Sequence, residues 1–83
     1  MIKVLFFAHL RDLAQLESIE IPLGDMAKVS DLLMGLAPHV PQALIDELGD
    51  QTAMISVDHK YAAWDAAISD NVEVGILPPV SGG

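Results

Sequence analysis

The chain ends on Gly82 and Gly83, which follow a pair of prolines at positions 78 and 79. Glycine has no Cβ and accepts almost any φ, so two glycines can pass through a narrow channel where a side chain would clash. Prolines favour an extended chain, and the six residues 78–83 span about 20 Å when extended. The sequence therefore predicts a tail that enters a pocket of a neighbouring protein and presents the terminal carboxylate of Gly83 for chemistry.

The other polar side chains offer little further chemistry. No pair among His9, His39 and His59 has a metal-ligand spacing such as i, i+4 on one helix, so no metal site is predicted. The chain has no cysteine, which excludes disulfides and thiolate chemistry. Ser81 does not lie in a Gly-x-Ser-x-Gly elbow, and no glycine-rich phosphate loop is present, so neither a nucleophilic serine nor an ATP site is expected.

An apolar surface beside this tail is the second candidate site. Alternation along the stretch 2–8 places four side chains on one face of a strand: Ile2, Val4, Phe6 and Ala8. Phe7 then faces the other way, and the same alternation turns Leu77 outward at the end of the last strand. We expect Tyr61 to join them from a neighbouring strand. A patch of this kind on a small domain indicates a protein interface, although scattered apolar surface residues are also common.

Composition and charge narrow the function further. The chain has 83 residues, enough for one domain, and 52% of them are apolar. Twelve acidic residues against four basic ones give a net charge of −8, which opposes nucleic-acid binding and leaves an anionic substrate to a more basic partner. Solubility alone also accounts for this charge. No apolar run approaches the roughly 20 residues of a membrane helix, and no signal peptide is indicated, so we expect a cytoplasmic location.

Hydrophobic periodicity predicts five strands, at residues 2–8, 17–23, 52–57, 61–63 and 72–77. Helical spacing predicts a helix at 29–37 and a shorter one at 41–49, while the stretch 9–16 is predicted as a short helical or turn connection. The buried face of the 29–37 helix is expected to carry Val29, Leu32, Leu33 and Leu36.

The order of these elements predicts an α+β domain, with a mixed sheet of about five strands and a helix packed across it. A right-handed crossover places the last strand parallel to the first at the sheet centre. This is the β-grasp, or ubiquitin-like, architecture, and Pro22 favours an edge position for strand 17–23. We expect the domain to span residues 1–77 and a flexible C-terminal tail to follow at 78–83. The tail consists of Pro78, Pro79, Val80, Ser81, Gly82 and Gly83.

The chain resembles the family of molybdopterin synthase small subunits, which are ubiquitin-like sulfur carriers. The resemblance is carried by two stretches, KVLFFAHLRDLA near the start and DNVEVGILPPVSGG at the end. The ending PPVSGG is the most specific part of this resemblance, which extends over essentially the whole chain. It implies that a ubiquitin-activating-like adenylyltransferase, using ATP and Mg, adenylates the terminal glycine, which then becomes a thiocarboxylate. It also implies a heterotetramer whose large subunit holds the active site and uses two such tails to form the molybdopterin dithiolene. The chain itself is then a non-catalytic carrier that binds no cofactor.

By position, the resemblance implies that Gly83 is the sulfur-bearing residue and that Gly82 is the residue without a side chain that precedes it. It assigns partner contacts to Phe7, Arg11, Tyr61 and Leu77. The chain departs from the family where Ile76 and Leu77 replace aromatic residues that often precede the prolines, which affects partner affinity rather than chemistry. At the start of the 29–37 helix, Lys28 replaces a capping threonine, a loss of about 1 kcal/mol unless Ser30 caps one turn later.

Three other functions remain open from the sequence. The same sulfur chemistry could serve thiazole synthesis or a tungsten cofactor, although PPVSGG argues against the thiazole carrier. A second alternative is a protein modifier that is joined through Gly83 to lysines. The third is a β-grasp binding adaptor in which the terminal glycines are incidental.

Overall fold

A five-stranded sheet with helices on one side is the framework of the protein, and the computed structural model describes residues 1–79. The strands are β1 (Ile2–Phe6), β2 (Ser18–Ile21), β3 (Met54–Val57), β4 (Lys60–Ala62) and β5 (Glu73–Leu77). The helices are α1 (Ala8–Ala14), α2 (Leu32–Leu36) and α3 (Gln42–Leu48), with a 3-10 turn, η1 (Val29–Asp31), directly before α2. No helix within residues 1–79 is long and apolar enough to span a bilayer.

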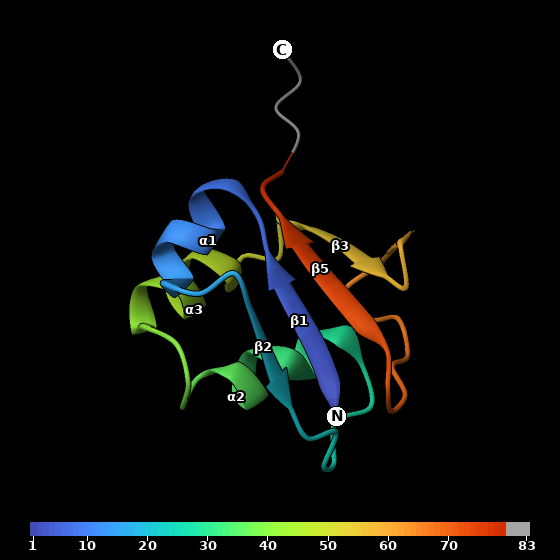
Figure 1. Cartoon of the computed structure of the whole chain (residues 1–83). Helices are drawn as coiled ribbons and strands as arrows, with labels where there is room; N and C mark the ends of the chain where they lie inside the picture. Colours follow the sequence, from blue (N-terminus) through green and yellow to red (C-terminus); the bar gives the residue numbers. More distant parts are fainter. Residues whose placement is uncertain (80–83) are drawn as a thin grey trace.

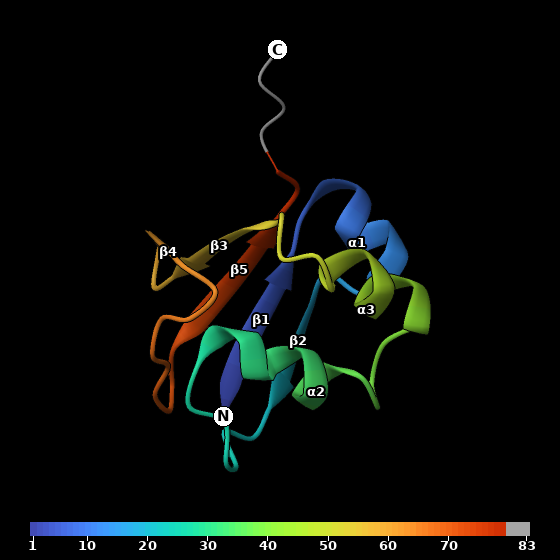
Figure 2. The ribbon, with the colours of Figure 1, turned by 180° about the vertical axis from the view of Figure 1, so that it is seen from behind.

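The strand order across the sheet is β2-β1-β5-β3-β4. The central strands β1 and β5 are parallel, and every other neighbouring pair is antiparallel. Figure 1 shows the open face of the sheet, and Figure 2 shows α2 and α3 in front of its opposite face. The parallel central pair and the helical crossover confirm the predicted β-grasp fold. β2 lies at an edge of the sheet, as Pro22 indicates, because proline has no N–H to donate to a further strand.

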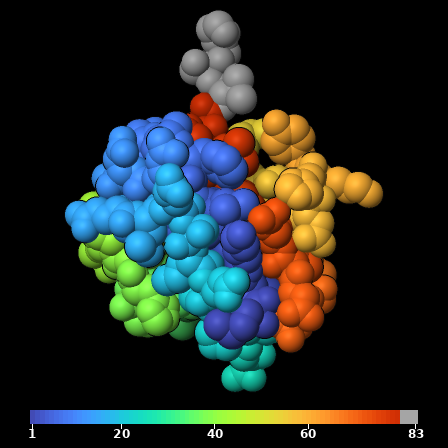
Figure 3. Space-filling view, viewed as in Figure 1, coloured from blue at the N-terminus to red at the C-terminus, as the bar shows by residue number. Residues whose placement is uncertain are grey.

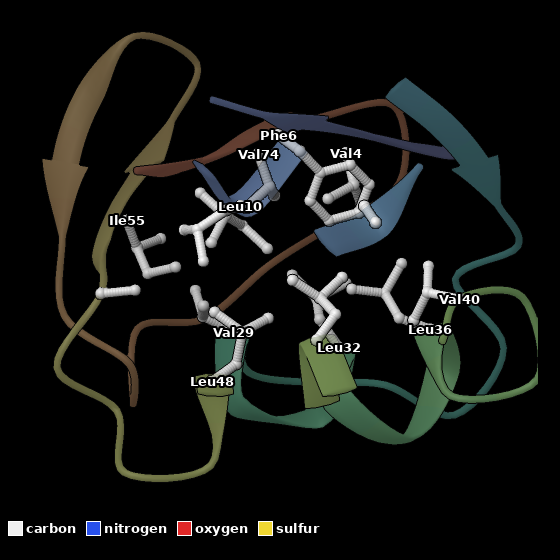
Figure 4. Packing of buried hydrophobic residues seen from close by; sticks show 14 of the residues in the cluster. Val4, Phe6, Leu10, Val29, Leu32, Leu36, Val40, Leu48, Ile55 and Val74 are labelled. Carbon is white, nitrogen blue, oxygen red and sulfur yellow. The ribbon is translucent and has the colours of Figure 1, made fainter. Parts of the chain in front are cut away.

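The hydrophobic core lies between the inner face of the sheet and the helices (Figure 4). Strand alternation puts Val4, Phe6 and Val74 on this inner face, and each is at most 2% exposed. Leu32 and Leu36 of α2 are buried in the same cluster. Burying one such side chain contributes about 1.5–3 kcal/mol, so the two layers stabilise each other. The helices thus cover the inner face, and the opposite face of the sheet is open (Figure 1).

The first strand is shorter than predicted, because β1 ends at Phe6 and α1 begins at Ala8. Ala8 has a φ of 52°, a left-handed conformation that costs an L-residue about 1–2 kcal/mol. Packing of α1 against α3 and the sheet, with Leu10 and Ala14 buried, offsets this cost. The expectation that Ala8 continues the inner face of the strand was therefore wrong.

The predicted helix at 29–37 is divided into η1 and α2. The N–H groups of Val29 and Ser30 donate to the carbonyl oxygens of Ala66 and Trp64, at 2.9 and 2.8 Å. These hydrogen bonds tie the first turn to a neighbouring loop. Of the residues expected on the buried face, Val29, Leu32 and Leu36 are buried, whereas Leu33 is only half-buried.

The side chain of Asp31, rather than that of Ser30, caps the N-terminus of η1. Its carboxylate Oδ2 accepts hydrogen bonds from the N–H groups of Ala27 and Lys28, at 2.8 and 3.0 Å. These backbone hydrogen bonds hold the pKa of Asp31 below its ordinary value. An acidic side chain that accepts from the N-cap N–H forms one half of a capping box. This turn is therefore capped even though Lys28, rather than threonine, stands at the N-cap.

The buried position of Leu36 predicts a large effect of its truncation. Leu36→Ala should lower the free energy of unfolding by about 2–5 kcal/mol, because the cavity left behind is filled by no other group. Leu33→Ala is the matched control, and because Leu33 is half-buried it should lower this free energy clearly less. Urea denaturation of both variants checks this, and equal losses would contradict the assignment of the core face.

The pKa of Asp31 predicts a pH-dependent contribution to stability. The folded pKa lies below the unfolded value of about 3.9, so this contribution is present at neutral pH. It is lost as the pH falls from about 3.9 through the folded pKa. Asp31→Asn should therefore be less stable than the parent chain at pH 7, and the difference should shrink as the acid range is entered. Urea denaturation of both chains over a pH series measures this difference in the free energy of unfolding. A difference that does not change with pH would contradict a stabilising role of the hydrogen bonds from Ala27 and Lys28 to the Asp31 carboxylate.

Candidate functional site

The outer face of the sheet carries a shallow depression near the end of β5. It has a volume of about 260 Å³ and is lined by Phe7, Ser56, His59, Tyr61 and Leu77. In Figure 3 the hairpin of β3 and β4, coloured yellow to orange, stands out beside the red end of β5. The residues come from β3, β4, β5 and the two turns next to them, so the sheet itself sets their spacing.

The register of the strands explains why these side chains share one face. Leu5 pairs with Gly75, Gly75 with Ser56, and Ser56 with Tyr61, which makes one row across β1, β5, β3 and β4. The row contains no side chain at Gly75, and the next outward-facing residue along β5 is Leu77. Side chains two positions apart on a strand point to the same face, so Leu77 borders the row.

The backbone of Phe7 is fixed at both its N–H and its carbonyl group. The N–H donates to the carbonyl oxygen of Ile76 at 3.2 Å, which extends the pairing of β1 with β5. The carbonyl oxygen accepts from the N–H groups of Leu10 and Arg11, at 3.1 and 3.4 Å, in the first turn of α1. Phe7 therefore joins a strand to a helix; the residue is 40% exposed, and it lines the depression on the outer face.

The hairpin between β3 and β4 turns through Asp58 and His59, whose φ angles are 49° and 72°. Two-residue hairpin turns of this kind usually contain glycine, because positive φ is unfavourable for other residues. Here the turn is attached to Glu73 of β5. The Asp58 N–H donates to the Glu73 carbonyl at 2.8 Å, and the Glu73 N–H donates to Asp58 Oδ1 at 2.9 Å. These bonds hold the hairpin, and with it Tyr61, in place beside the depression.

One pair of ionisable side chains borders this site. The five lining side chains include no carboxylate, and His59 is paired with Glu73, with Nε2 3.2 Å from Oε2. The described carboxyl groups with a lowered pKa lie elsewhere, in turns. Thr52 lowers the pKa of Asp50 through its N–H and hydroxyl, and the amino group of Met1 lowers that of Asp70. Within residues 1–79 no three His, Asp or Glu side chains are placed to hold a metal ion.

The structure brings together three of the four residues assigned to partner contacts, namely Phe7, Tyr61 and Leu77. Arg11 is separate from them, since it lines another shallow hollow, on α1, together with Asp12, Gln15, Leu16 and Glu17. Pro78 and Pro79 follow β5 directly, with Pro79 exposed. The other predicted tail residues lie outside the described part of the chain: Val80, Ser81, Gly82 and Gly83.

Sequence reasoning missed Ser56, His59 and Gly75 as parts of this site. Ser56 could have been found, because it alternates with Ile55 and Val57 and so points away from the core. His59 was considered only as a metal ligand. The sequence does predict a tight turn between the strands at 52–57 and 61–63, and the structure has one at Asp58 and His59. What was missed is that this turn brings His59 to the edge of the depression.

Known proteins match this chain over essentially its whole length. Residues 4–83 match the ThiS family. The molybdopterin synthase sulfur carrier subunit of Escherichia coli (strain K12) is 32% identical over 83 residues, which is 100% of each chain. That of Chlamydomonas reinhardtii is 34% identical over 84 residues and covers 99% of this chain and 98% of the relative.

Two solved structures extend the comparison to the fold. The crystal structure of SAMP1 from Haloferax volcanii, a small archaeal modifier protein, has a TM-score of 0.79 at 26% identity, covering 99% of this chain and 98% of that one. The complex of subunits 1 and 2 of the molybdopterin-converting factor from Helicobacter pylori 26695 gives a TM-score of 0.64 at 22% identity, covering 99% and 97%. The chain therefore belongs to the ThiS family, with the sulfur carrier subunits of molybdopterin synthase among its relatives.

Proposed function

We propose that this protein is the sulfur carrier subunit of a molybdopterin synthase and that Gly83 carries the sulfur. A carboxylate oxygen of Gly83 attacks the α-phosphate of ATP on an activating enzyme, and pyrophosphate leaves. A sulfide equivalent from a donor then displaces AMP and leaves a terminal thiocarboxylate. A carboxylate is a poor electrophile, so adenylation is needed to supply the leaving group. The thiocarboxylate that results is a strong nucleophile, and it stores sulfur in a chain that has no cysteine.

The single observation that carries this proposal is the match over the full chain to two curated sulfur carrier subunits of molybdopterin synthase. The geometry of the described residues supports it. The outer face presents Phe7, Tyr61 and Leu77 around one depression, and Leu77 directly precedes Pro78, where the proposed tail begins. A partner bound on this face is well placed to receive the tail.

The large subunit of the synthase is the partner that we propose for this surface, in a heterotetramer. The Helicobacter pylori relative is solved as a complex of subunits 1 and 2, which supports such an assembly. In this proposal the active site lies on the large subunit, while this chain supplies the tail. The net charge of −8 favours the same division, since a phosphorylated pterin precursor is better held by a more basic protein.

A protein modifier is the second candidate function. SAMP1 from Haloferax volcanii, a small archaeal modifier protein, shares the fold at a TM-score of 0.79 with 26% identity. A modifier would use the same adenylated terminus but would transfer it to the amino group of a lysine instead of to sulfur. The two functions therefore differ in the product formed at Gly83.

Changes to the tail test the sulfur-carrier proposal. Deletion of Gly83 should abolish conversion of precursor to molybdopterin by the reconstituted synthase, because the carbon that carries sulfur is displaced. Gly82→Ala should keep the carboxylate but slow adenylation or sulfur transfer, because a placement error near 1 Å can cost about a hundredfold in rate. The measurements are ATP–pyrophosphate exchange with the activating enzyme and single-turnover sulfur transfer. Chain termini generally contribute little to stability, so both variants should unfold like the parent chain.

Gly49→Ala is the matched control for these variants. Gly49 has a φ of −64° and meets nothing closer than 3.5 Å around an added Cβ, so the same substitution fits there without strain. It should leave both rates unchanged. Normal precursor conversion by the chain that lacks Gly83 would overturn the sulfur-carrier proposal, and wild-type rates for Gly82→Ala would remove the narrow-channel argument.

A further inference from the structure

Gly75 occupies an unusual place on the outer face of the sheet. It is the middle residue of β5 and pairs with Leu5 on one side and with Ser56 on the other. Although it belongs to the outward-facing row, it is buried. Neighbouring side chains must therefore cover it on the side that faces away from the core.

The neighbours of Gly75 occupy the space that a side chain would need. A Cβ placed on Gly75 would lie 2.6 Å from Ser56 Oγ and 3.3 Å from Phe7 Cε2. The first distance is shorter than real Cβ contacts allow, so Ser56 would have to move. The second is tighter than ordinary van der Waals contact, so the Phe7 ring would have to give way by a few tenths of an ångström. The ring of Phe7 thus rests on the backbone of β5, where any other residue would lift it.

The backbone conformation does not explain a glycine at this position. Gly24 has a φ of +53°, which favours glycine, whereas Gly75 does not lie in the left-handed region. Glycine inside a strand is less favourable than alanine by roughly 0.5–1 kcal/mol. A glycine that weakens a central strand often marks a close approach of another group, and here that group is the Phe7 ring with Ser56.

We propose that Gly75 is a positioning residue for the docking surface, which acts by setting the height of the Phe7 ring above the sheet. The inference rests on the proposed function, in which this face binds the large subunit. The backbone of Phe7 cannot follow a displaced ring, because its N–H and carbonyl are bonded to Ile76 and to the first turn of α1. A methyl group at position 75 therefore rotates or lifts the ring and changes the shape that the partner meets.

Four variants separate this role from a purely structural one. Gly75→Ala alone introduces both close contacts. Ser56→Ala removes the hydroxyl that makes the shorter contact, so the double variant Gly75→Ala/Ser56→Ala keeps only the methyl beneath Phe7. Ser56→Ala is the matched reference for the double variant. Phe7→Ala measures how much the ring itself contributes to binding of the large subunit.

Two measurements are made on each variant: urea denaturation, and calorimetric binding to the large subunit. The double variant should be at least as stable as Ser56→Ala, since alanine suits a strand better than glycine. It should nevertheless bind the large subunit about threefold to tenfold more weakly than Ser56→Ala, while Phe7→Ala should lose roughly tenfold or more, as truncated interface anchors do. Ring-current shifts of the Leu77 methyl groups should differ between the double variant and Ser56→Ala, which reports the moved ring without a partner.

The outcomes distinguish the inference from the function on which it rests. If Phe7→Ala weakens binding but the double variant binds like Ser56→Ala with unchanged Leu77 shifts, Gly75 does not position the ring and the docking surface stands. If Phe7→Ala leaves binding unchanged, the surface is not the docking site, and the inference fails with it. Should Gly75→Ala alone fail to fold, the double variant, which lacks the severe contact, decides between these results.

Discussion

The parallel pairing of β1 with β5 is the constraint on which the rest of the site depends. Val4 pairs with Val74 and Phe6 with Ile76, and the N–H of Phe7 extends this ladder to the carbonyl of Ile76. Parallel strands end at the same edge of a sheet, so the chain leaves β5 beside the point where Phe7 turns into α1 (Figure 1). An antiparallel pair would place Phe7 and the proposed tail at opposite ends of the domain.

The same pairing divides the sheet into two faces with different tasks. On the inner face, Val4 and Val74 are fully buried beneath the helices and contribute stability. On the outer face, Gly75 leaves room for the Phe7 ring to lie close to the backbone, and the clamp between Asp58 and Glu73 holds the β3–β4 hairpin at the side. The proposed docking surface is thus built on hydrogen-bonded backbone at each margin. A preorganised surface loses little conformational entropy on binding, which suits the proposed role of a carrier that engages an activating enzyme and a synthase in turn.

Much of this architecture could be predicted from the sequence, because strand alternation is a local signal. It placed Val4 inward and Phe7 outward, and the element order identified the β-grasp fold and the central position of β5. The misses have different causes. The left-handed turn at Ala8 depends on the packing of α1 against α3 and the sheet, which are distant in the sequence. The hydrogen bonds from Ala27 and Lys28 to the Asp31 carboxylate are local, within four residues, and were missed because only Ser30 was considered as a cap. Arg11 was assigned a partner contact through the resemblance alone; it lies in a different hollow from the other three residues, and its partner contact stays a prediction.

The central claim is that Gly83 stores sulfur, and intact mass spectrometry of the protein purified from cells that make molybdopterin tests it most directly. The account predicts a species heavier by the exchange of one oxygen for one sulfur, with the added mass confined to the C-terminal peptide. This species should disappear when the chain is incubated with the large subunit and the pterin precursor. Recovery of the protein chiefly as isopeptide conjugates to lysines, or as unmodified chain that supports molybdopterin formation without ever acquiring sulfur, would contradict the account.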